Sequence, residues 1–219
     1  MARSSNGSSE ADDGRLVHTV TGSRLWLYAK GRRLPLAMFV LVVCVCGAAA
    51  LQNQSLIAPT FTSISNVPLP LLLLPVGASV AAGSLASPTG DLDRSDTGAL
   101  RPARLWHVAV LGLLGTGVGL LVGLLLCTGT AAMQARAFVF WYGLALMSTV
   151  MFGGQWCWVL PSLSVIAHLA AIGYPGLGTW SWIDAPITAI PASILTLASL
   201  TAGLAVILLG WRRSTRAHP

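Results

Sequence analysis

The chain has 219 residues, of which 54% are hydrophobic and only 9% are charged, and its formal net charge at pH 7 is +6. Soluble globular proteins carry about 25% charged residues, so this composition excludes an ordinary soluble domain and favours a polytopic membrane protein. Its Lys and Arg residues lie between long uncharged runs. They do not form the basic stripe that nucleic-acid binding needs, so we expect no nucleic-acid partner.

The N-terminal part of the chain divides into a tail and a short basic segment. Residues 1–22 are polar and rich in Ser and Gly, with no apolar core, which predicts a disordered cytoplasmic tail and not a secretory signal. Residues 23–33 interleave Leu, Trp and Tyr with Arg and Lys. Two interpretations stay open for this segment: it lies on the cytoplasmic leaflet of the bilayer, or it is an ordinary basic flank of the first span.

Six apolar segments follow, and each is expected to be a membrane-spanning helix. Their predicted ranges are 34–50, 67–85, 105–127, 132–152, 156–172 and 191–211. The predicted fold class is therefore an all-α polytopic membrane protein, with a six-helix transmembrane domain at 34–211 and a cytoplasmic tail at 212–219. The bilayer itself is the first expected partner.

The third segment, Leu105–Cys127, has the clearest pattern. It carries no charged residue and is long enough, at about 1.5 Å per residue, to cross a hydrocarbon core of about 30 Å. Four glycines share one narrow face at helical spacing, which predicts close packing against neighbouring helices: Gly112, Gly115, Gly119 and Gly123. We therefore expect this helix to lie at the centre of the bundle.

Basic residues predict the orientation of the chain. When both termini are placed in the cytoplasm, every Lys and Arg except Arg136 falls in an inner segment. This agrees with the excess of Lys and Arg in cytoplasmic loops of membrane proteins. The sequence thus predicts a multi-pass protein of the cell membrane with both termini cytoplasmic.

Two loops carry candidate functional residues. The inner loop between the second and third spans holds a candidate docking surface for a soluble partner, although a plain solvated loop fits equally well: Asp91, Asp93, Arg94, Asp96, Arg101 and Arg104. The outer loop, residues 173–190, predicts either a structured cap or a re-entrant turn. A candidate outer-rim site combines Arg136 with Trp180, Trp182 and Asp184; the alternative is that Arg136 and Asp184 are unrelated surface charges.

No catalytic pattern is visible in the sequence. His107 and His168 are predicted at opposite depths, so one haem iron could not join them. The four cysteines lack CxxC spacing and are expected to be buried thiols. HExxH, GxSxG and GxxxxGK[ST] motifs are absent. We therefore expect no enzyme, no metal and no cofactor, and any ATP-driven work would need a separate subunit.

The layout resembles the membrane subunits of ABC-2 type exporters. The features that carry the resemblance are the basic lead-in RLWLYAKGRRLPLA, six spans, an inner loop between spans 2 and 3 and a Gly/Trp-rich outer element. The composition also resembles small actinobacterial permease-like membrane proteins. The resemblance implies coupling of residues 24–33 and 91–104 to a separate ATPase, a homodimer or heterodimer of six-span units, and an amphiphilic or apolar cargo. Two alternatives stay open: a six-span substrate-binding subunit of an uptake system, and a non-transporting scaffold or immunity protein.

Overall fold

The computed structural model describes residues 28–59, 64–86, 101–126, 130–172, 186 and 188–216. Within this part of the chain the fold is predominantly helical, as predicted. The long helices match the six apolar segments to within a few residues at most ends, and α8 runs five residues further: α2 (Leu34–Ala50), α3 (Pro70–Gly83), α5 (Arg101–Leu125), α6 (Ala131–Met151), α7 (Val159–Ile172) and α8 (Ile190–Arg216). The proposed tail at 1–22 lies outside the described residues.

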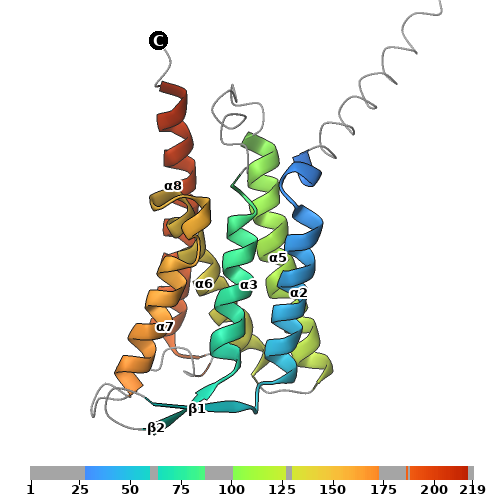
Figure 1. The fold of residues 1–219 in the computed structure, drawn as a ribbon, viewed down its shortest axis with the longest axis vertical. Coiled ribbons are helices and arrows are strands. Elements are labelled where there is room, and N and C mark those ends of the chain that lie inside the picture. The colour runs from blue at the N-terminus through green and yellow to red at the C-terminus, as the bar shows by residue number, and fades with distance from the viewer. Residues whose placement is uncertain are drawn as a thin grey trace, which may run out of the picture.

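The helices run side by side, and successive helices run in opposite directions (Figure 1). The start of α2 and the end of α8 consequently lie at the same end of the bundle. We call this the basic end, because all Lys and Arg of the described residues except Arg136 belong to segments at this end. We call the opposite end the hairpin end, because the two paired strands described below lie there.

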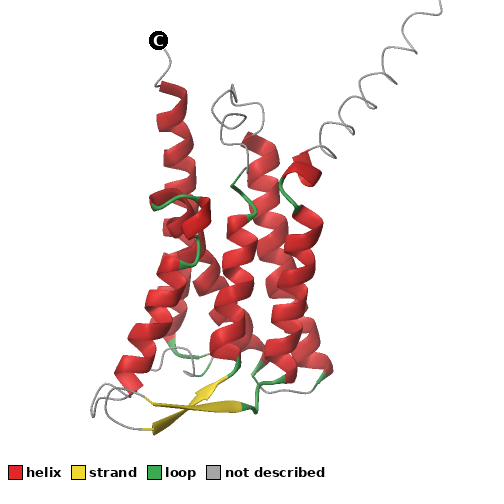
Figure 2. Ribbon diagram, in the orientation of Figure 1, coloured by secondary structure: helices red, strands yellow, loops and turns green. Residues whose placement is uncertain are grey.

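A two-stranded sheet, which the sequence analysis did not predict, covers the hairpin end (Figure 2). Strands β1 (Ser55–Pro59) and β2 (Ile64–Pro68) pair antiparallel, with Ser55 opposite Pro68 and Pro59 opposite Ile64. Because Val67 and Pro68 belong to β2, helix α3 begins later than the predicted start of the second span. The all-α prediction is correct for the bundle and incomplete for this connection.

Helix α6 lies at the centre of the bundle, where we had expected α5. It packs against α3, α5, α7 and α8, and Trp141 and Leu146 are completely buried. The Nε1–H group of Trp141 donates to Oγ of Ser164 on α7 (3.0 Å), and the Tyr142 hydroxyl donates to the Val108 carbonyl of α5 (2.9 Å). The expectation for α5 was wrong because its strong hydropathy accompanies a large exposed face.

Proline and glycine set several helix boundaries. Pro35 and Pro70 lie in the first turns of α2 and α3, where a missing amide hydrogen removes no helical hydrogen bond. Pro75 lies inside α3. Between α6 and α7, Gly153 has φ 92°, a left-handed conformation that glycine adopts without strain. Helix η1 (Gly154–Trp156) then leads directly into α7.

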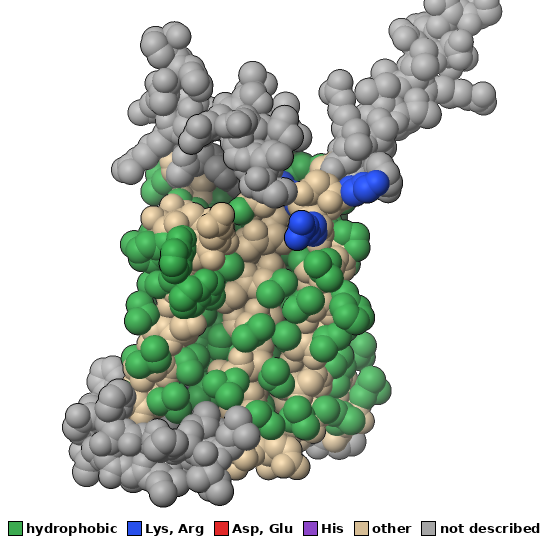
Figure 3. Space-filling model, viewed as in Figure 1, with side chains coloured by type: hydrophobic (Ala, Val, Ile, Leu, Met, Phe, Trp, Pro, Cys, Tyr) green, Lys and Arg blue, Asp and Glu red, His purple; other side chains and the backbone are tan. Residues whose placement is uncertain are grey.

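The outside of the bundle is strongly apolar. Large hydrophobic side chains are exposed on every long helix, including Phe39 (66%) on α2, Leu113 (73%) on α5 and Leu197 (63%) on α8. The face shown in Figure 3 is covered with hydrophobic side chains, and Lys and Arg side chains appear only at the basic end. Soluble monomers rarely expose continuous apolar surface on this scale.

Candidate functional site

Three segments meet at a histidine at the basic end. His107, near the start of α5, is almost completely buried. Its Nε2 lies 3.0 Å from Oγ of Ser84, which follows α3, and its Nδ1 lies 3.3 Å from the hydroxyl oxygen of Tyr28. The guanidinium of Arg32 lies 4.8 Å from the centre of the Tyr28 ring. We call Tyr28, Ser84 and His107 the basic-end cluster.

The hydrogen bonds of the Ser84 and Tyr28 hydroxyl groups indicate which tautomer His107 adopts. Ser84 Oγ donates its single proton to the carbonyl oxygen of Ala81 at 2.7 Å, so it accepts the hydrogen bond from His107 Nε2–H. The other ring nitrogen, Nδ1, then has a lone pair and accepts from the Tyr28 hydroxyl. The cluster therefore fastens the lead-in segment to both α5 and the end of α3, which are the two helices that the inner loop connects.

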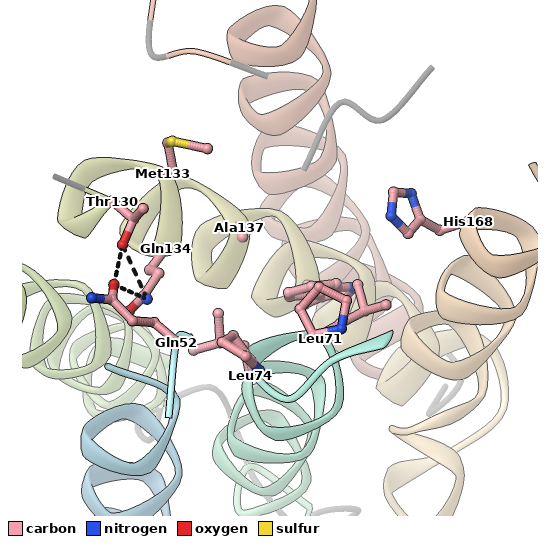
Figure 4. Close-up of a pocket in the computed structure, with 11 residues that line it drawn as sticks. Gln52, Leu71, Leu74, Thr130, Met133, Gln134, Ala137 and His168 are labelled. Carbon is pink, nitrogen blue, oxygen red and sulfur yellow. Dashed lines mark hydrogen bonds between the residues drawn. The ribbon is translucent and has the colours of Figure 1, made fainter. Parts of the chain in front are cut away.

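A pocket of about 160 Å³ lies at the hairpin end, between α3, α6 and α7. Its polar side is made by Gln52, Thr130 and Gln134 (Figure 4). The Thr130 hydroxyl donates to Oε1 of Gln52, and Nε2 of Gln134 lies 3.5 Å from both of these oxygen atoms. His168 lies on the far side of the pocket, on α7. The rest of the lining is mostly apolar, including Leu71, Leu74 and Trp141.

This pocket can hold only a small ligand. Sites for drug-sized ligands have volumes of about 300–1,000 Å³, well above the 160 Å³ of this pocket. The volume accommodates a few water molecules or one small molecule. His107 and His168 lie at opposite ends of the bundle, and no group of three His, Cys, Asp or Glu side chains within the described ranges could hold a metal ion.

The predicted packing glycines lie against α6 and α2. A Cβ atom at Gly112 would lie 3.1 Å from Cε1 of Tyr142, and one at Gly115 would overlap the ring of Phe138. A Cβ at Gly119 would lie 3.3 Å from Cγ1 of Val45 on α2. Gly123 is also buried. The glycine face of α5 therefore meets its neighbours, while the opposite face of α5 is exposed.

The other predicted sites fall mainly on residues that are not described. Asp91, Asp93, Arg94 and Asp96 of the inner loop lie outside the described residues, as do Trp180, Trp182 and Asp184. Arg101 and Arg104 lie in the first turn of α5, at the basic end. Arg136 is buried near the start of α6, where its Nη1 donates to the Pro186 carbonyl at 3.1 Å, which fastens α6 to the segment before α8.

Sequence reasoning missed the most extensive contact between two helices of the described residues, which joins α6 to α8. Gly143 and Gly203 lie at this crossing. The available signal was a stripe of mostly small residues on α8, in which buried side chains recur at helical spacing: Ala192, Thr196, Ser199, Gly203 and Ile207.

The cysteines form no paired redox centre within the described residues. Cys44 and Cys157 are buried free thiols, and Cys46 is half-buried; Cys127 is not described. No model of a known protein family matches the chain, and neither do any curated proteins or solved structures that were compared with it.

Proposed function

We propose that the protein crosses the cell membrane six times, with both termini in the cytoplasm. The observation that carries this proposal is the exposure of its most apolar helices. The stretches Pro102–Leu125 and Ile190–Leu209 are long enough to span a bilayer, and in each most apolar window only 28% of the residues are buried. A core helix of a soluble protein would be mostly buried, whereas a helix at the edge of a membrane bundle faces lipid.

The ends of the bundle support the orientation. Lys30, Arg32 and Arg33 lie at the end where α2 begins and α8 ends, and basic residues are concentrated in cytoplasmic segments. The indole side chains of Trp106 (71% exposed) and Trp158 (48% exposed) also lie near this end. Indoles favour either membrane–water interface, so they support a membrane surface at this end, and the basic residues favour its cytoplasmic side.

Cysteine labelling in intact cells tests this topology. In a chain whose native cysteines are replaced by Ser, Asn53→Cys introduces a thiol at the exposed hairpin end and Lys30→Cys introduces one at the exposed basic end. A membrane-impermeant maleimide should label Asn53→Cys in intact cells and Lys30→Cys only after lysis. Labelling of Lys30→Cys in intact cells would contradict the proposed orientation.

The function we propose is that of a permease subunit in an ATP-driven, ABC-2-like transporter, energised by a separate ATPase chain. The basic-end cluster supports it, because Tyr28, Ser84 and His107 join the lead-in segment, α3 and α5 into one unit. A push from an ATPase on the inner loop would thus move both helices together, and closely packed helices transmit such a movement as a rigid-body tilt. Cargo would pass at the seam between two six-helix units.

The alternative substrate-binding function is less well supported by the geometry. The hairpin-end pocket, which would face the outside, is small, and a vitamin-sized substrate taken up from that side would need a larger site there. A ligand that copurifies with the isolated chain would nevertheless favour that alternative over the permease. Purification of the chain alone, with neither a ligand nor associated subunits, would favour the non-transporting scaffold or immunity protein.

Affinity purification in mild detergent tests the permease proposal. A tagged chain should bring down an ATPase with a phosphate-binding loop, and the Arg94→Glu/Arg101→Glu variant should release it. Asn53→Glu, which alters the exposed hairpin end, is the control and should retain it. If the wild-type chain brings down neither an ATPase nor a second six-span subunit, the permease proposal is wrong.

A further inference from the structure

Two hollows adjoin near the end of α3 that lies at the basic end. The larger, of about 720 Å³, lies between α3 and α7 and is lined mainly by apolar side chains of these helices and of the turn before α7, including Leu72, Val76, Trp158 and Ile166. The second, of about 550 Å³, lies at the basic end between the lead-in segment, α2 and the end of α3, and is lined in part by Arg32, Arg33 and Gln155. Both hollows border Val80, Gly83 and Gly154, so they adjoin there, and we call the two together the lateral groove, with an apolar length and a basic mouth.

The positive charge at the mouth of the groove determines which kind of ligand fits it. Arg33 is exposed, and Arg32, which is largely buried with its guanidinium over the Tyr28 ring, also lines the mouth. No Asp or Glu occurs among the described residues, so the described side chains that line the groove carry positive charge only. Arginine guanidinium groups bind phosphate through short, charge-assisted hydrogen bonds, which makes the mouth complementary to a phosphate group.

The apolar part of the groove is about as long as one leaflet of a bilayer is thick. From Leu72 to Gly83 helix α3 rises about 17 Å, at about 1.5 Å per residue, and one leaflet of the hydrocarbon core is about 15 Å thick. The hydroxyl of Ser79 within this stretch already donates to the Pro75 carbonyl at 2.7 Å. The Ser79 hydroxyl therefore needs no polar ligand group in that part of the groove.

We propose that this lateral groove is a binding site for an anionic phospholipid of the cytoplasmic leaflet. The acyl chain lies between α3 and α7, and the phosphate group faces Arg32 and Arg33 at the mouth. This inference rests on the proposed membrane location of the bundle and not on the proposed transport activity.

Native mass spectrometry of the detergent-purified protein tests the proposal, with phosphatidylglycerol and phosphatidylcholine of identical acyl chains as probes. The wild-type protein should retain phosphatidylglycerol over phosphatidylcholine, and Arg33→Gln should reduce this preference about five-fold, the factor expected for one basic residue near an anionic lipid surface. Lys30→Gln removes an exposed charge that does not line the groove and should reduce it less.

A second pair of variants tests the apolar length. Val76→Phe fills the groove and should lower retention of both lipids, whereas Val43→Phe should not, because Val43 is equally exposed (52% against 51% for Val76) but lies outside the groove. Equal retention of the two lipids by the wild-type protein would indicate nonspecific annular lipid and overturn the proposal. A preference unchanged by Arg33→Gln, or equal behaviour of the two valine variants, would also overturn it.

The experiment separates this inference from the proposal on which it rests. A protein that stays soluble and monomeric without detergent would overturn the membrane location itself. A protein that needs detergent and shows the predicted labelling, but retains both lipids equally, would overturn the lipid site alone.

Discussion

Gly203 of α8 lies so close to Gly143 of α6 that a Cβ atom at position 203 would sit 2.6 Å from the Gly143 carbonyl oxygen. A Cβ at position 143 would likewise lie 2.6 Å from the backbone of Ser199. The Ser199 hydroxyl donates to the Phe140 carbonyl at 2.8 Å beside this crossing. Helices in lipid associate through such close packing and through interhelical hydrogen bonds, because lipid is as apolar as their side chains.

The first prediction concerns this crossing. Gly143→Leu and Gly203→Leu should each destabilise the bundle by about 1–3 kcal/mol, because backbone atoms must move apart to admit the side chain. Gly117→Leu is the control, since a Cβ there meets nothing within 4 Å, and it should change stability by less than about 0.5 kcal/mol. Unfolding in a titration with a denaturing detergent measures the difference. Equal stability of Gly203→Leu and Gly117→Leu would show that the helices do not cross here.

The second prediction concerns Gly115 and Phe138. Gly115→Ala should destabilise the protein, because the new methyl group overlaps the Phe138 ring. Since this neighbour is a side chain, Phe138→Ala should relieve the clash and the two changes should couple by about 0.5–3 kcal/mol in a double-mutant cycle. Gly119→Ala, which meets only Cγ1 of Val45 at 3.3 Å, should cost less than Gly115→Ala. Strict additivity of Gly115→Ala and Phe138→Ala would contradict the contact.

The third prediction concerns the basic-end cluster. Tyr28→Phe and Ser84→Ala each remove one hydrogen bond to His107 and should cost about 0.5–1.5 kcal/mol. Tyr28→Phe should also release the lead-in segment, so trypsin should cleave faster after Lys30 and Arg33.

The matched control for this cluster is Ser193→Ala. Ser193 is exposed and its hydroxyl donates to the carbonyl of Ala189, the residue just before α8, at 3.4 Å, so this change should leave the rate of cleavage unaltered. If Tyr28→Phe and Ser193→Ala are cleaved at the same rate as the wild-type protein, the cluster does not hold the lead-in segment.

The fourth prediction concerns Arg136. Its Nη1 donates to the Pro186 carbonyl at 3.1 Å, and a hydrogen bond from a charged donor contributes about 1.5–3 kcal/mol. Arg136→Met keeps the apolar stem and removes the donor, so it should lower the free energy of unfolding by about this amount. Arg136→Lys should recover part of the loss. A Met variant as stable as the wild-type protein would mean that Arg136 does not fasten the segment before α8.

The sequence by itself determined where the helices lie. Apolar runs and their boundaries located α2 residue for residue and α6 to within one residue at each end, because burial or lipid contact acts on each segment locally. The glycine face of α5 was also visible, since its spacing is a local property. The pairing of β1 with β2 was not visible in the sequence, because strand pairing depends on which turn brings two short segments together.

Only the tertiary structure decided which helix lies at the centre. Hydropathy made α5 the most conspicuous segment, yet α6, which carries buried Gln134, Arg136 and Ser148, occupies the middle. The physical reason is that a helix facing lipid must be apolar all along its exposed face, whereas a central helix can carry polar groups that its neighbours satisfy. High hydropathy therefore accompanies an exposed face, which the proposed membrane location assigns to lipid, and centrality follows from small residues such as Gly143 and Gly203, whose partners are distant in sequence.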